Sequence, residues 1–243
     1  KMFSRKLNQK ELEKIKNDVT EIKNQLDELK NKTDEKKNKL NQILLEIPNL
    51  VDDKVPIGKS EIDNITIKEV GKINKPDFKI KNHVEILENN NLLDYNKASK
   101  LSGSRFSVLR SSLATLHRAL VNFMIDINVT EFQYEECIVP ELVKSDCLTG
   151  TGQLPKFDED LFRTNFNDLW LIPTAEVPLT NFHREEIIDS TTLPLRYTSF
   201  TNCFRSEAGA AGKDTKGLMR EHQFGKVELV SIVEPNKSMT EME

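Results

Sequence analysis

Residues 201–229 read TNCFRSEAGAAGKDTKGLMREHQFGKVEL, and this stretch decides the fold. Runs typical of β-strands, 197–207 and 219–232, flank a glycine-rich segment, 208–217. At about ten residues this segment is long for a hairpin connection, and long ordered loops in compact domains are often functional. The pattern therefore predicts a β-hairpin whose connecting loop takes part in function.

Side-chain alternation predicts that one face of this hairpin is charged. Arg205 and Glu207 share a face of the first strand, and the matching face of the second strand carries His222, Phe224, Lys226 and Glu228. An aromatic ring among these charges suits an adenine, and the arginine suits a phosphate. A solvated sheet face also carries mixed charges, and a lone histidine is more often a structural hydrogen-bonding residue than a catalyst. The residues alone are compatible with a nucleotide site and indicate no more.

Residues 1–47 have a different pattern, with no glycine or proline and with apolar residues in steps of three and four. These residues are Leu12, Ile15, Val19, Ile22, Leu26, Leu29, Leu40, Ile43 and Ile47. The spacing predicts one long helix with a heptad seam, and so narrow an apolar stripe needs a partner helix. Periodicity alone favours a generic coiled-coil dimerisation stalk.

The rest of the chain predicts a connector and then alternating helices and strands. Residues 48–104 are punctuated by proline and glycine, and they include a strand candidate at 65–67 and a helix candidate at 83–93. Further along, the expected elements are a helix at 106–127, a strand at 132–139 and a short strand beginning at Trp170. The segment 148–153, LTGTGQ, lacks the spacing and the lysine of a P-loop, so a plain turn is favoured over a phosphate cradle.

Composition excludes several classes of protein. Of 243 residues, 37% are hydrophobic and 30% are charged, and the net charge of -4 excludes a polycation that binds nucleic acid with its whole surface. The three widely spaced cysteines predict neither a disulfide framework nor a zinc site, and they suit a reducing cytoplasm. No apolar run approaches the roughly 18 residues of a membrane span. We expect a cytoplasmic protein with no membrane or DNA partner.

Four blocks of the sequence resemble one family. Residues 201–229 resemble motif 2 of the class II aminoacyl-tRNA synthetases in its seryl form, and 171–181 (LIPTAEVPLTN) resemble the serine-binding segment of the seryl-tRNA synthetases. Residues 103–140, beginning GSRF, resemble motif 1, and IPNL at 47–50 with VPIG at 55–58 resembles the junction that follows the tRNA-binding arm. The resemblance, to the bacterial type of the family, covers essentially the whole chain.

The resemblance implies an α+β fold, namely the class II antiparallel sheet flanked by helices. It assigns 1–47 to the second helix of an antiparallel coiled-coil tRNA-binding arm, 48–104 to a connector and 105–243 to the catalytic domain with motifs 1 and 2. The first helix of the arm and motif 3 are not in the sequence, so the sheet is expected to be incomplete at its C-terminal end. We therefore expect a partial chain that does not charge tRNA by itself.

The family's reaction is the activation of L-serine with ATP to seryl-adenylate, followed by transfer to tRNA(Ser), and to tRNA(Sec) where that tRNA is present. The implied requirements are ATP as a substrate, Mg2+ as its counterion, no metal bound by protein ligands, and a homodimer formed through the helix and strand in 105–140. The loop residues 213–216 would meet the acceptor end of the tRNA, and the arm would contact its outer body through phosphates.

The resemblance also assigns roles to particular residues. The catalytic pair is Arg205 and Glu207, and the serine site is Thr174, Ala175, Glu176, Arg205 and Glu228. The ATP site is Arg205, Ser206, Glu207, Glu221, His222, Gln223 and Phe224. Within it Arg205 would bridge the α-phosphate and the serine carboxylate, and Phe224 would stack on the adenine. Glu228 would accept the serine hydroxyl, so that alanine would leave a buried acceptor unpaired.

Three positions depart from the family pattern, and two alternative functions remain open. Glu221 replaces the usual Val or Met, Gly225 replaces Glu, Asp or Asn, and Gln133 replaces the Gly before Tyr134. One alternative is a synthetase-like protein that charges a carrier protein, although such relatives generally lack the tRNA arm. The other is a coiled-coil structural protein with an inactive domain. Intact Arg205 and Glu228 count against this second alternative.

Overall fold

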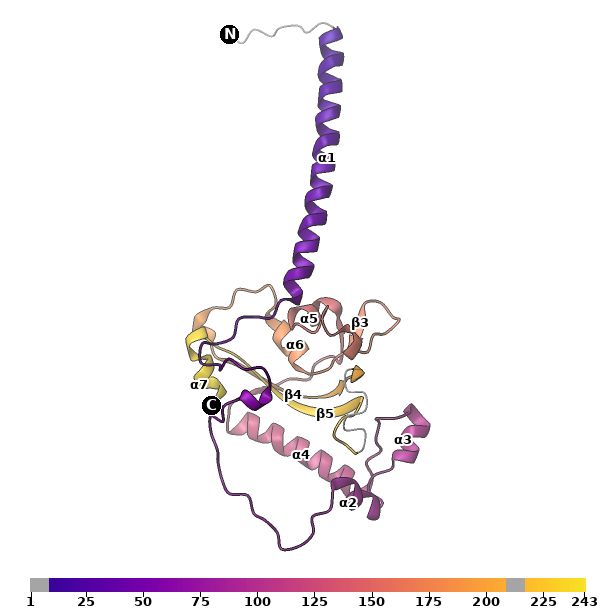
Figure 1. Cartoon of the computed structure of the whole chain (residues 1–243), viewed down its shortest axis with the longest axis vertical. Helices are drawn as coiled ribbons and strands as arrows, with labels where there is room; N and C mark the ends of the chain where they lie inside the picture. Colours follow the sequence, from indigo (N-terminus) through magenta and orange to yellow (C-terminus); the bar gives the residue numbers. More distant parts are fainter. Residues whose placement is uncertain (1–8, 209–216) are drawn as a thin grey trace. The chain divides into compact units, whose positions relative to one another are not determined.

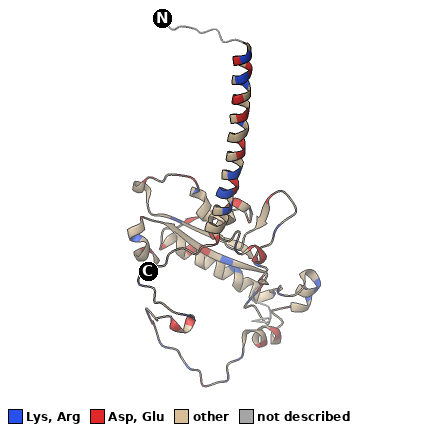
Figure 2. Ribbon diagram, turned by 45° about the horizontal axis from the view of Figure 1, so that its top comes forward, with Lys and Arg blue, Asp and Glu red and all other residues tan. Residues whose placement is uncertain are grey.

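The computed structural model describes residues 9–208 and 217–243, and the chain divides into two compact units, Lys1–Ile65 and Thr66–Glu243. The first unit contains α1 (Gln9–Glu46), a single uninterrupted helix (Figure 1). Charges of both signs alternate along it (Figure 2). Every residue of α1 is exposed, including Leu26 and Leu29 of the predicted seam at 60% each. The predicted helix is confirmed, and its apolar stripe is uncovered in the described part of the chain.

The remainder of the first unit has little regular structure. A single 3-10 turn, η1 (Glu61–Asp63), is closed by a capping box in which the Ser60 hydroxyl accepts from a backbone N–H. The strand predicted at 65–67 is wrong, because no described residue pairs with this exposed segment. The alternating apolar residues of 65–67 do not pack against a sheet. β-propensity alone does not stabilise a strand that has no cross-strand neighbours.

A three-stranded sheet forms the centre of the second unit, in the order β1 (Glu135–Glu136), β4 (Leu195–Phe204), β5 (Gln223–Ile232). β4 and β5 are the predicted antiparallel hairpin, in a register that sets Cys203 opposite Phe224 and Thr201 opposite Lys226. β1 runs parallel to β4, so this sheet is mixed rather than wholly antiparallel. A second antiparallel pair consists of β2 (Leu142–Lys144) and β3 (Leu169–Leu171).

Helices lie on both sides of the β4–β5 hairpin (Figure 1). On one side α4 (Ser111–Thr130) is held by the Asn128 amide, which donates to the Thr198 hydroxyl at 3.1 Å. On this side a Cβ at position 225 would lie 2.8 Å from the Phe200 ring, which explains the glycine found there. On the other side lies α6, near α5. The short helices are α2 (His83–Asn89), α3 (Tyr95–Ser102), α5 (Ser145–Gly150), α6 (Glu176–Thr180) and α7 (Ser238–Met242).

Two small apolar clusters hold the second unit together. One joins β2, β3 and α5 through Val143, Leu148, Leu161, Trp170, Ile172 and Val177. The other lies under β4 and contains Val139, Ala175, Leu179 and Tyr197. Each fully buried aliphatic side chain contributes roughly 1.5–3 kcal/mol. Both clusters pack against the segment 172–179, so the core fixes the stretch that the sequence assigns to the serine site.

Several predicted boundaries are wrong by a few residues. The helix predicted from 106 begins at Ser111, because Phe106 to Leu109 is extended and Leu109 pairs with Leu93 in an isolated bridge. That bridge also ends the helix predicted at 83–93, which stops at Asn89. The strand predicted at 132–139 is reduced to Glu135–Glu136. The hairpin strands end at Phe204 and begin again at Gln223, and beyond the first strand Glu207 has a left-handed φ of 53°.

The apolar stripe of α4 is where the sequence predicts it, but it does not face the sheet. Ile125 and Asn128 are the buried positions of this helix. The predicted stripe lies on the opposite side, with Leu116, Leu120 and Phe123 exposed by 52%, 48% and 60%.

The described part of the chain contains no helix with the length and hydropathy that a membrane span requires.

Candidate active site

The candidate site lies at the end of the β4–β5 hairpin, where the segment 172–176 crosses it. The Phe204 amide donates to the Ile172 carbonyl at 2.9 Å, and Arg205 Nε donates to the Pro173 carbonyl at 3.2 Å. Ile172 is fully buried, so this crossing is anchored in the core. The two predicted blocks, the hairpin and the 171–181 segment, are therefore brought together.

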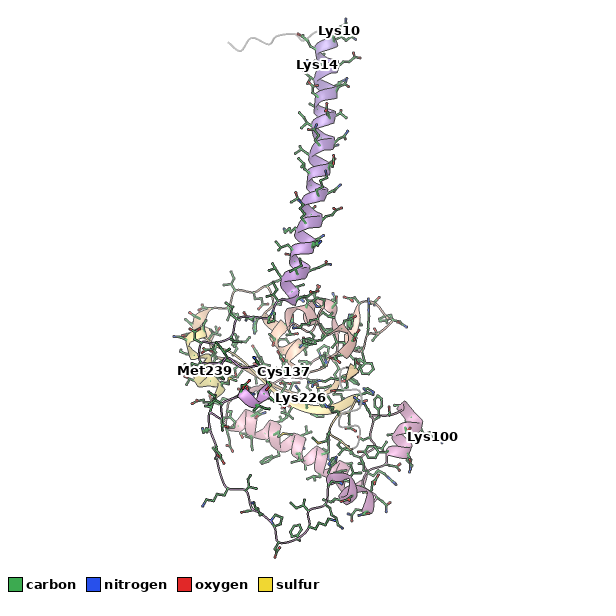
Figure 3. All side chains as sticks on the ribbon, viewed as in Figure 1. Lys10, Lys14, Lys100, Cys137, Lys226 and Met239 are labelled. Carbon is green, nitrogen blue, oxygen red and sulfur yellow. The ribbon has the colours of Figure 1, made fainter. Side chains whose placement is uncertain are left out.

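A cavity of about 390 Å³ opens at this crossing. It is lined by Gln153, Phe157, Asp160, Leu161, Pro173, Thr174, Glu176, Arg205, Glu207, Arg220 and Lys226. Alternation along β5 places Phe224, Lys226 and Glu228 on the face that α4 does not cover. Lys226, labelled in Figure 3, lines the cavity. Cations and carboxylates both line the cavity, which suits a ligand that carries phosphate and ammonium groups.

Thr174 and Lys226, which line the cavity, form a closed polar cluster with Glu228. The Thr174 hydroxyl donates to the Glu228 carboxylate at 2.6 Å and accepts from Lys226 Nζ at 2.7 Å. Lys226 also forms an ion pair with the Glu228 carboxylate. Glu228 is therefore fixed in position, and its carboxylate has capacity for a further hydroxyl donor.

Arg205 lies over the ring of Phe224. Its guanidinium carbon is 5.2 Å from the ring centroid, which is a cation–π distance. Stacking together with the bond to Pro173 leaves the guanidinium little rotational freedom, so its planar fork is oriented in advance. A fork of this kind can bind two oxyanions at once.

Glu207 and Arg220 are paired across the cavity. Arg220 Nη1 lies 2.8 Å from the Glu207 carboxylate, and the Glu207 side chain is only 14% exposed. The left-handed backbone of Glu207 is unusual for a residue with a Cβ, and such positions are frequent at functional sites. Arg220 belongs to the segment 217–222 that leads into β5, so the ion pair ties this segment to the end of β4.

The remaining predicted residues have other surroundings. Ala175 is fully buried behind the cavity in the second apolar cluster. The Ser206 hydroxyl donates to the Glu159 carbonyl. His222 Nδ1 bonds to the Arg205 carbonyl at 2.9 Å, and its ring packs between those of Phe106 and Phe162, so its interactions are structural. The predicted tRNA contact at 213–216 lies outside the described residues.

Glu221, Gln223 and Phe224 line a different cavity, of about 320 Å³, which α4 also lines through His117. Burial raises the pKa of the Glu221 carboxyl, and a hydrogen bond from Ser107 offsets part of that effect. Its Oε1 atom is buried without a hydrogen-bond partner among the described residues. The side chain of Glu221 is thus a local cost to the fold, at one of the positions that depart from the family pattern.

Arg220, Gln153 and Asp160 line the cavity but were not predicted as site residues. Arg220 has the same parity as His222, Phe224 and Lys226, so extending the alternation by one step would have found it. Gln153 ends the segment 148–153, where a plain turn was favoured. Asp160 comes from a 3-10 turn, η2 (Asp158–Asp160), and carries no local signal.

Among the described residues, no group of three or more His, Cys, Asp or Glu side chains could hold a metal ion.

Comparison with known proteins gives the same assignment over most of the chain. Residues 156–243 match the family model of the tRNA synthetase class II core domain (G, H, P, S and T). The serine–tRNA ligase of Caldicellulosiruptor bescii is 52% identical over 83% of this chain and 48% of that protein. The serine–tRNA ligase of Pseudomonas fluorescens is 53% identical over 84% of this chain and 49% of that protein. The chain spans about half the length of these relatives.

Solved structures agree with the sequence comparison. The seryl-tRNA synthetase of Pyrococcus horikoshii complexed with ATP is 37% identical, with a TM-score of 0.83 over 91% of this chain and 54% of that chain. The cytoplasmic serine–tRNA ligase of Naegleria fowleri in complex with AMP is 32% identical, with a TM-score of 0.80 over 95% of this chain and 54% of that chain.

The sheet, the hairpin site and the matching family model together define a class II aminoacyl-tRNA synthetase core. Within that class, the relatives at about 50% identity are all serine–tRNA ligases. The chain belongs to the seryl-tRNA synthetase family.

Proposed function

We propose that the protein to which this chain belongs activates L-serine with ATP and transfers the seryl group to tRNA(Ser), and to tRNA(Sec) where it is present. One observation carries the proposal. Two residues that line one cavity, Thr174 and Arg205, each hold a further group: Thr174 is bonded to Glu228, a fixed carboxylate that can accept a small hydroxyl, and Arg205 stacks on the ring of Phe224. Serine and adenylate are the two parts of the product that such a cavity would hold.

The serine end of the proposed site is the Thr174–Lys226–Glu228 cluster with Glu176. Glu228 would accept the serine hydroxyl, and the Glu176 carboxylate, which lines the cavity, would bind the ammonium. Ala175 contributes by its small size, because it is fully buried beside Thr174 and holds the segment against the core. Discrimination against alanine would follow, since alanine leaves a desolvated acceptor unpaired.

The ATP end of the proposed site is centred on Arg205 and Phe224. The adenine would stack on Phe224, while Arg205 would bridge the α-phosphate and the serine carboxylate. The backbone of 221–223, with Ser206 and Glu207, would frame the nucleotide, and Arg220 adds a cation to the lining. The carboxylates near these cations fit Mg2+ arriving with the triphosphate, because magnesium is usually bound through substrate phosphates and one or two carboxylates.

The proposed chemistry needs no activated side chain. A serine carboxylate oxygen attacks the α-phosphorus, the new P–O bond forms, and the bond to the bridging oxygen breaks to release pyrophosphate. The protein positions the reactants and neutralises charge that develops on the α-phosphate, chiefly through Arg205. In the second step a hydroxyl of the terminal adenosine of the tRNA attacks the seryl carbonyl and AMP leaves.

The other parts of the chain have roles in the same proposal. α1, with its exposed seam and mixed charges, would be one helix of an antiparallel arm that contacts tRNA, at 1–47, and 48–104 would connect it to the catalytic domain at 105–243. The exposed apolar stripe of α4 would form a homodimer. Both roles fit a protein that works in the cytoplasm.

Two assays on the purified protein, as the cell makes it, test the proposal. Serine-dependent exchange of pyrophosphate into ATP should be observed, together with charging of tRNA(Ser). Exchange without tRNA charging would favour a carrier protein as the acceptor. Absence of exchange with serine would overturn the proposal and favour an inactive domain on a coiled-coil stalk.

A further inference from the structure

A histidine outside the candidate site holds the segment that delivers Arg220. His83 is the first residue of α2, and its Nε2 accepts a hydrogen bond from the backbone N–H of Leu218 at 3.0 Å. The bond joins residues 135 positions apart in the sequence, both of them in the second unit.

The local structure on both sides is built for this contact. Asn82 and Glu85 form a capping box at the start of α2, where His83 is the first helical residue. Gly217 has a φ of 86°, and a Cβ added there would lie 2.2 Å from His83 Nε2. A glycine is therefore required at 217 both by its backbone and by the approach of the histidine.

Three contacts hold the start, the middle and the end of the segment 217–222. His83 holds its start, the Glu207–Arg220 ion pair holds its middle, and the His222 amide donates to the Arg105 carbonyl at 2.9 Å at its end. The second attachment comes from the cavity lining, whereas the first and the third come from His83 and Arg105, outside that lining. Loss of that first bond would free Gly217 and Leu218, and with them the backbone that aims Arg220 into the cavity.

We propose that His83 is a positioning residue for the nucleotide end of the site: it fixes segment 217–222, and through it Arg220, for binding the phosphates of ATP. This inference rests on the proposed function, because it assigns Arg220 to the ATP side. The serine cluster is supported by β5 and the segment 172–176, which His83 does not contact through any hydrogen bond of the described residues. The effect of His83 should thus fall on ATP and spare serine.

The test is steady-state pyrophosphate exchange with three variants. His83→Leu, which has no acceptor, should raise the KM for ATP about tenfold, on the scale of one lost hydrogen bond, and change the KM for serine less than about twofold. His83→Gln places an amide oxygen near the same position and should recover most of the loss. Glu85→Ala is the matched control, since it weakens the start of α2 but keeps the imidazole.

A double-mutant cycle gives a second, independent reading. Gly217→Ala should be harmful in the wild-type protein because of both the clash and the positive φ. In the His83→Ala background the clash with the imidazole is gone, so the added effect of Gly217→Ala should be smaller. Equal effects of Gly217→Ala in both backgrounds would contradict the inference, and this holds even if His83→Leu does not fold.

Other outcomes separate this inference from the proposed function. Equal increases in both KM values in His83→Leu, or a Glu85→Ala control as damaging as His83→Leu, would show a merely structural role and overturn it. If His83→Leu exchanges pyrophosphate with the same kinetics as an active wild type, the inference is overturned and the proposed function is unaffected. Should the wild type show no exchange, the function fails, and faster deuterium exchange at the Leu218 amide in His83→Leu would still show that the bond orders the segment.

Discussion

At the scale of single residues, Arg205 is the group on which the proposed activation step depends most. Its guanidinium is oriented by Phe224 and by the Pro173 carbonyl. Replacement of Arg205 by Ala should lower serine-dependent pyrophosphate exchange by at least about 100-fold, the usual effect of losing one preorganised charge donor. Arg205→Lys should recover little, because an ammonium cannot bridge two oxyanions as a fork does. Activity within a few fold of wild type would refute this role.

Glu228 and Thr174 should control the choice of amino acid rather than the affinity for ATP. They share a hydrogen bond of 2.6 Å on the serine side of the cavity. Glu228→Gln and Thr174→Val should each raise the KM for serine about tenfold or more while the KM for ATP stays within about twofold. The measurement is exchange kinetics with each substrate varied in turn. An ATP defect with an unchanged serine KM would show that the two ends of the cavity are assigned the wrong way round.

Glu221 should make stability depend on pH. Burial raises the pKa of this carboxyl in the folded protein above its ordinary value of 4.5. The folded state therefore binds the proton more tightly than the unfolded chain, and stability falls as the pH rises from the ordinary value through the raised one. Glu221→Gln removes this dependence. Its thermal midpoint should exceed that of the wild type near pH 7, and the difference should shrink as the pH approaches about 4.

At the scale of secondary-structure elements, the hairpin could be predicted and its ends could not. Alternation along 223–232 correctly placed Phe224, Lys226 and Glu228 on one face, because strand parity is a property of the sequence alone. The left-handed Glu207 and the extended run before Ser111 depend on contacts between distant segments, such as the Leu93–Leu109 bridge. Asp160 reaches the cavity through tertiary packing, which no local pattern encodes.

The stripe on α4 yields a prediction about assembly. Leu116, Leu120 and Phe123 face away from their own sheet and are about half exposed, so a second copy of the chain would cover them in the proposed homodimer. Phe123→Glu should shift the protein to a monomer in sedimentation velocity, because a charge in an apolar interface core is costly. Asn122→Glu, on the flank of the same helix, is the control and should leave the dimer intact. A dimer that persists in Phe123→Glu would exclude this face as the interface.

At the scale of the whole molecule, activation and tRNA charging should be separable. The first unit contains α1, and every described residue of the proposed amino-acid and nucleotide sites lies in the second. Replacement of the seam residues Leu26 and Leu29 by Glu should weaken any coiled-coil partner of α1. Charging of tRNA(Ser) should then fall by at least about tenfold, while pyrophosphate exchange stays within about twofold of wild type.

The off-seam variant Asn24→Glu is the control for added charge on the arm, and it should affect charging less than the seam variant. Parallel losses of exchange and charging in the seam variant would mean that α1 supports the catalytic unit rather than the tRNA. The seam itself was readable from sequence because heptad spacing is local. The partner helix could not be predicted, because an exposed heptad seam shows that a helix needs a partner but does not identify that partner.

Calorimetric titration with a non-hydrolysable analogue tests whether the site binds serine and adenylate together. The seryl form of sulfamoyl-adenosine should bind the purified protein at one site per chain. The alanyl form, which lacks only the hydroxyl, should bind at least about 100-fold more weakly, and Glu228→Gln should remove most of that difference. Equal affinity for the two analogues, or no binding of the seryl form, would contradict the account.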